Sequence, residues 1–89
     1  LCTATVRVAV LPQDPPPGLV PNLGVYYTDV VVSAAANLLL KPEDFKATVS
    51  LANGSPGTAT YQVRVDPPAG VRVDRASPVT IELIPAPLP

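Results

Sequence analysis

Apolar and polar side chains alternate with a period of two in several short runs of this chain. The runs read TATVRVAV at 3–10, FKATVSL at 45–51, TATYQVRV at 58–65 and VTIEL at 79–83. Successive side chains of a β-strand point to opposite faces, so each run predicts a strand with one buried face. The residues expected on the buried faces are Val6, Val8, Val10, Phe45, Ala47, Val49, Leu51, Tyr61, Val63, Val65, Val79, Ile81 and Leu83. β-Branched residues fill these runs, which favours an all-β fold.

Thirteen prolines divide the chain into short pieces. Proline is not tolerated in a helix interior, so a long helix is excluded over most of the sequence. The window 36–45 does not alternate, and Pro42 suits the first position of a helix with Glu43 and Asp44 in its first turn. We therefore expect at most one short helical turn, near residues 38–44.

The chain contains two similar halves. The run at 3–10 aligns with the run at 58–65, the loop PPPG at 15–18 with PPAG at 67–70, and TDVVVSA at 28–34 with SPVTIEL at 77–83. Proline presets the backbone before a turn, and glycine permits conformations that other residues resist. One such unit cannot bury its apolar face alone. We therefore predict a small twisted β domain with an internal pseudo-two-fold repeat, built from units of about 3–34 and 58–84 and a linking segment 35–57.

The composition suits one small domain with a weakly charged surface. The chain has 89 residues, of which 15% are charged, and its net charge is −1. The six basic residues are scattered, whereas a phosphate-binding face requires several clustered cations. Nucleic acid is therefore not an expected partner, and RNA or ribosome binding is a less favoured function than protein interaction or a spacer role.

The second half resembles a YbbR domain. The matching positions follow the pattern DFxAxVDLS, a glycine turn, alternating valines, P-x-G-V-x-V and P-x-x-V-x-V-x-L. They are Asp44, Phe45, Ala47, Val49, Leu51, Gly57, Tyr61, Val63, Val65, Pro68, Gly70, Val71, Val73, Pro78, Val79, Ile81 and Leu83. The first half matches more loosely, with Ser33-Ala34 where the family often has serine followed by glycine, and Ser50 replaces a common aspartate.

The resemblance implies a role outside the cytoplasm. YbbR domains typically occur in tandem after a membrane anchor, on the outer side of bacterial membranes. One parent protein of this kind is similar to a regulator of a membrane-bound diadenylate cyclase, which makes cyclic di-AMP. We accordingly expect residues 1–89 to be one YbbR-like domain of a longer multi-repeat protein, since the chain lacks methionine and no apolar run approaches the ~20 residues of a membrane span.

Candidate chemistry is sparse in this sequence. There is no histidine, which excludes Ser-His-Asp and Cys-His arrangements, and Cys2 is the only cysteine. Glu43 and Asp44 are the only adjacent carboxylates, and the NGSPG segment at 53–57 lacks the lysine of a phosphate loop. We expect no catalytic, cofactor or metal site, and hence no enzyme.

The remaining candidates are two neighbouring tyrosines. Tyr26 and Tyr27 lie in an extended stretch, so one of them should point outward. An exposed tyrosine on a weakly charged surface suits contact with a protein partner, and packing over the end of the sheet is the alternative. We favour an interaction module that contacts sister repeats and a protein such as the cyclase. The alternative is a passive spacer.

Overall fold

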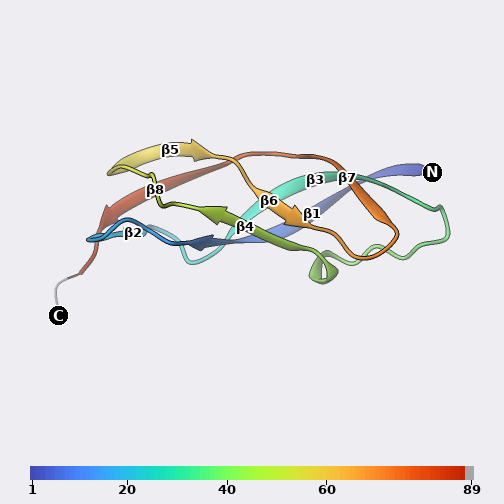
Figure 1. Cartoon of the computed structure of the whole chain (residues 1–89), viewed down its shortest axis with the longest axis horizontal. Coiled ribbons are helices and arrows are strands. Elements are labelled where there is room, and N and C mark those ends of the chain that lie inside the picture. The colour runs from blue at the N-terminus through green and yellow to red at the C-terminus, as the bar shows by residue number, and fades with distance from the viewer. Residues whose placement is uncertain (88–89) are drawn as a thin grey trace.

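The computed structural model describes residues 1–87, which form an elongated all-β domain measuring 51 × 21 × 15 Å. Its elements are β1 (Cys2–Gln13), β2 (Leu19–Pro21), β3 (Tyr26–Ala34), the 3-10 helix η1 (Pro42–Asp44), β4 (Lys46–Ser50), β5 (Gly57–Tyr61), β6 (Arg64–Asp66), β7 (Val71–Ala76) and β8 (Val79–Pro85). β1 begins at one end of the long axis and β8 finishes at the other (Figure 1). The prediction of an all-β fold with one short helical turn is confirmed.

The strands form two sheets that share one core. The larger has the order β6-β4-β1-β3-β7, and the smaller has the order β2-β8-β5. β1 and β4 run parallel, and all other described pairs are antiparallel. Because β1 is flanked by β3 along most of its length and by β4 only near its end, it connects the first unit to the linking segment 35–57.

The sheet topology reproduces the repeat seen in the sequence. β1 pairs with β3 in the first unit, and β5 pairs with β8 in the second. The registers of the two pairs also agree. Val6 faces Val30 in the first unit, and the residues aligned with them, Tyr61 and Val79, face each other in the second. Each hairpin then receives the strand that follows the other unit's Pro-Gly loop, so that β7 joins β3 and β2 joins β8. This exchange gives the domain its pseudo-two-fold character.

The two Pro-Gly loops adopt the same turn. The Leu19 amide donates to the Pro16 carbonyl at 3.1 Å, and the Val71 amide donates to the Pro68 carbonyl at 3.3 Å. The third residue of each turn is a glycine in the left-handed region, with φ of 80° at Gly18 and 82° at Gly70. A type II turn requires positive φ at this position, which explains why both loops carry glycine there.

The predicted run at 58–65 is not one strand. The chain leaves the smaller sheet after β5, passes through Gln62 and Val63, and enters the larger sheet as β6. Alternation along the run is preserved, because Tyr61, Val63 and Val65 all remain half-buried against the core. A period-two pattern reports which face is buried, but it does not report which neighbour a strand pairs with.

The core is built from the alternating positions of both sheets. Its buried apolar members include Val6, Val8, Val10, Val30, Val32, Phe45, Ala47, Val49, Leu51, Val79, Ile81 and Leu83. Two buried polar side chains are hydrogen-bonded, since the Thr28 hydroxyl donates to the Ser77 carbonyl at 2.5 Å and the Ser33 hydroxyl donates to Asp74. Thr28 and Ser77 are aligned positions of the two units, so the halves bind one another at equivalent points.

Candidate interaction surface

The structure separates the roles of the two neighbouring tyrosines. Tyr26 is half-buried against the core, and its hydroxyl accepts a hydrogen bond from the Leu23 amide at 3.0 Å. Tyr27 faces the opposite side of β3 and is 61% exposed. The difference follows from strand alternation, because Tyr26 faces the buried Val10 while Tyr27 faces Ala9. Only Tyr27 therefore presents its ring to the solvent.

Tyr27 belongs to an exposed apolar area on the larger sheet, here called the outer patch and defined by Ala9, Leu11 and Tyr27. Leu11 is 56% exposed and lies beside Thr48 of β4. Ala9 lies beside Tyr27, which places the leucine one diagonal step from the ring. The outer patch therefore offers an aromatic and an aliphatic side chain on the exposed face of the sheet.

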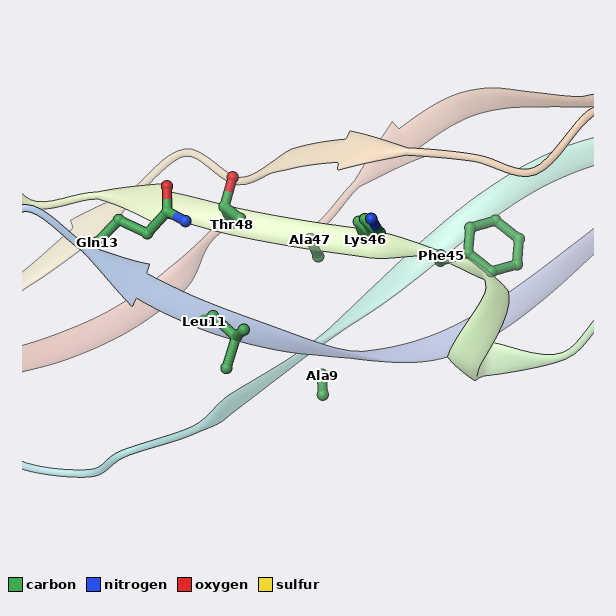
Figure 2. A pocket seen from close by; sticks show the side chains of 7 residues that line it. All are labelled: Ala9, Leu11, Gln13, Phe45, Lys46, Ala47 and Thr48. Atoms are coloured by element: carbon green, nitrogen blue, oxygen red, sulfur yellow. The ribbon is translucent and has the colours of Figure 1, made fainter.

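An open hollow of about 490 Å³ adjoins the outer patch. Figure 2 shows its lining side chains on β1 and on the segment through β4, where Phe45 lies just beyond η1. The lining residues are Ala9, Leu11, Gln13, Phe45, Lys46, Ala47 and Thr48. The lining is mostly apolar, with one ammonium, one amide and one hydroxyl. Such a site can accept an apolar side chain and orient it with a few polar contacts.

Leu11 was not singled out from the sequence, although a signal exists. The outward positions of β1 are polar at Thr3, Thr5 and Arg7, but they become apolar at Ala9 and Leu11. An alternating strand whose solvent face turns apolar near its end is a recognisable departure from the pattern. The hollow itself had no such signal, because the β1–β4 pairing brings together residues more than 30 positions apart.

One exposed ion pair borders the outer patch, where Arg7 Nε lies 3.4 Å from Asp29 Oδ1, and a further set of electrostatic contacts lies at the β7 edge of the larger sheet. The register of β3 and β7 shifts so that Asp74 is passed over, and its carboxylate accepts hydrogen bonds from Ser33 at 2.5 Å and Arg72 at 2.9 Å. The Ser33 hydrogen bond is the main reason that the pKa of Asp74 lies below its usual 3.8. Partial desolvation opposes this shift, and Arg72 supports it. These contacts fasten an edge strand to the domain.

The described residues bring no set of chemically reactive groups together. Within residues 1–87, no group of three or more His, Cys, Asp or Glu side chains could hold a metal ion. Glu43 and Asp44 are exposed in η1, and Cys2 is an exposed free thiol at the start of β1. No helix in this part of the chain is long and apolar enough to cross a membrane.

The fold and the outer patch define a small β-rich domain with an exposed apolar surface. Comparison with sequence families found no match, and a search of curated proteins found none either. Among solved structures, a YbbR family protein from Desulfitobacterium hafniense DCB-2 matches with a TM-score of 0.70 at 20% sequence identity. The match covers 93% of this chain and 98% of that one. The chain therefore has the fold of a YbbR-like domain, as the sequence resemblance predicted.

Proposed function

We propose that this domain is a non-enzymatic protein-interaction module, one repeat of a membrane-anchored, extracytoplasmic regulator of a diadenylate cyclase. The observation that carries the interaction role is the outer patch, where Leu11 and Tyr27 are 56% and 61% exposed. Tyrosine is enriched in the buried centres of protein interfaces, while lysine and carboxylates are depleted there. The YbbR-like fold supports the narrower assignment to cyclic di-AMP signalling.

The contact can be described at the level of side chains. Tyr27 and Leu11 would act as anchors, and an apolar side chain of the partner would enter the hollow beside Phe45. Lys46 and Gln13 at its lining provide donors for a partner carbonyl or carboxylate. Among the residues in the hollow, none carries a negative charge, so an acidic rim on the partner would be complementary.

The test uses the full-length parent protein co-expressed with its membrane diadenylate cyclase. The double variant Leu11→Ser with Tyr27→Ser should reduce co-purification of the cyclase and change cyclic di-AMP output. The matched control is Leu39→Ser, because Leu39 is 74% exposed but lies in the connection between β3 and η1, outside the outer patch. Unchanged co-purification and cyclic di-AMP levels in the double variant would contradict the regulatory role.

A passive spacer is the second candidate, favoured by the shape of the domain. The domain is 51 Å long and 15 Å thick, and β1 starts at the end opposite to that where β8 finishes (Figure 1). A spacer needs only length, so replacing this module with an unrelated β domain of similar length should preserve function. Loss of cyclase regulation after that exchange would reject the spacer.

A further inference from the structure

Within residues 1–87 the two sheets end in four edge strands, and three of them carry features that discourage pairing with another chain. Short length, proline, charged side chains and bulges are the usual protections of a sheet edge. The protected edges are β2, with three residues including Pro21; β6, with three residues including Arg64 and Asp66; and β7, with Arg72, Asp74, Arg75 and a register shift.

The fourth edge, β5, has none of these protections. It reads GTATY over Gly57–Tyr61, contains neither charge nor proline, and pairs with β8 along all five residues without a shift. Residues 57–60 are exposed. Gly57 has a positive φ of 103°, and from Thr58 onward one side of the strand presents unpaired backbone amides and carbonyls to the solvent.

We propose that β5 pairs antiparallel with β5 of a second copy of this domain, across a two-fold axis at Ala59. The strand is self-complementary in this register. Ala59 faces its own counterpart, Thr58 faces Thr60 of the second copy, and Gly57 faces Tyr61 of the second copy. Cross-strand threonine pairs are favourable.

The neighbouring strand extends this complementarity. Thr60 faces Thr80 on β8, and their hydroxyls are 3.4 Å apart. Pairing would continue this row of hydroxyls through Thr58 of the second copy. On the other face, Ala59 faces Ile81 of β8, so two alanines would join two buried isoleucines in an apolar row. In the dimer, threonine hydroxyls of the two copies would therefore lie side by side on one face of the joined sheet, and apolar side chains of the two copies would lie side by side on the other face.

The expected dimer is weak. A five-residue antiparallel pair forms roughly four to six backbone hydrogen bonds. It buries much less than the roughly 1,200 Å² of a stable interface, so a dissociation constant on the order of 0.1 mM is expected. The net charge of −1 adds little repulsion between copies. This pairing rests on the proposed interaction role and adds a second copy of the domain as one of its partners. The edge strand β5 is separate from the outer patch, so both surfaces can be occupied independently.

Charge substitution at the two-fold axis tests the register. Ala59 is exposed, so Ala59→Lys and Ala59→Glu should fold normally, as checked by circular dichroism and urea unfolding. Each variant alone places like charges opposite one another and should weaken the dimer about tenfold or more in sedimentation equilibrium. An equimolar mixture of the two variants should restore association. A wild-type protein that stays monomeric up to about 1 mM, or a mixture that fails to associate, overturns the proposal.

Disulfide trapping supplies an independent measurement. In a Cys2→Ser background, Ala59→Cys places two thiols opposite each other, with Cβ atoms about 4.5–5.5 Å apart, and should yield a crosslinked dimer on mild oxidation. The matched control, Thr58→Cys, places the two cysteines on a diagonal about 7–8 Å apart, beyond disulfide reach. Equal crosslinking by both variants, or none by Ala59→Cys, overturns the pairing. The crosslinking experiment contains only this domain, so a negative result would reject the β5 dimer without bearing on the proposed contact with the cyclase.

Discussion

Replacing the glycines of the two Pro-Gly turns should destabilise the domain by similar amounts. Gly18 and Gly70 have φ of 80° and 82°, in the region that L-residues with a Cβ resist. Space is not the obstacle, since a Cβ at Gly18 would meet no heavy atom within 4 Å, and one at Gly70 would meet only Leu38 Cδ2 at 3.7 Å. The cost of Gly18→Ala or Gly70→Ala is therefore conformational.

The expected magnitude follows from that cost alone. Left-handed backbone costs an ordinary L-residue about 1–2 kcal/mol relative to the right-handed form. Alanine also lowers the conformational entropy of the unfolded chain, and this offsets the loss by stabilising the folded state by roughly 0.4–1 kcal/mol. The net loss in free energy of unfolding should be about 1 kcal/mol for each variant. For a domain of 89 residues this corresponds to a fall in Tm of about 4–8 °C.

Urea unfolding at equilibrium measures these differences directly, with an unchanged m-value showing that the folded state is preserved. Gly24→Ala is the matched control, because Gly24 does not have positive φ and a Cβ there would meet nothing within 4 Å. Its free energy of unfolding should stay the same or rise. Asparagine tolerates left-handed backbone better than alanine, so Gly70→Asn should cost less than Gly70→Ala.

The reasoning fails if Gly18→Ala and Gly70→Ala differ by more than about 1 kcal/mol, or if both match the Gly24→Ala control. The first result would mean that the two turns differ in energy despite their shared hydrogen bond and φ, and the second would mean that positive φ at these positions costs alanine little.

Three further predictions concern single side chains. Gly54→Ala should cost about 1–3 kcal/mol in urea unfolding, because its Cβ would lie 2.5 Å from Leu83 Cδ1 and 2.9 Å from the Tyr61 hydroxyl; a neutral result would show that this turn can move. Asp74→Asn should lower stability at pH 7. Since the folded-state pKa lies below 3.8, the contribution of the carboxylate is present above that pH and is lost as pH falls through the folded value. The two proteins should therefore converge in strong acid, and a gap independent of pH would refute the ionic explanation. Tyr26→Phe should cost about 0.5–1.5 kcal/mol through the lost acceptor for the Leu23 amide, while Tyr27→Phe should unfold like wild type; equal losses would contradict the assigned orientations.

Much of the fold could be predicted from residue patterns. Alternation placed Val6, Val8 and Val10 on one face, and all three are buried. Pro42 with two acidic residues predicted a helical turn that the structure has as η1. The repeated Pro-Gly loops predicted equal turns, and the hydrogen bonds of Leu19 and Val71 confirm this. These features depend on neighbouring residues, whose preferences are local.

Other features had no local signal. The left-handed backbone of Asp14, with φ of 54°, ends β1 without the glycine that usually marks such a position. The break between β5 and β6 and the hollow between β1 and β4 depend on which strands become neighbours. That choice depends on the summed burial of both halves, and no single segment contains it.

The sequence by itself determined that this chain forms strands, which face of each strand is buried, and that two similar units each contain the same kind of Pro-Gly turn. A side-chain period of two and the backbone limits of proline and glycine act within a few residues, so they can be read without coordinates. Only the tertiary structure decided that each unit adds a strand to the other's hairpin, that Tyr27 and Leu11 share an exposed surface, and that β5 is left open. These outcomes follow from contacts between residues far apart in the chain, whose energies are realised only when the two sheets close over one core.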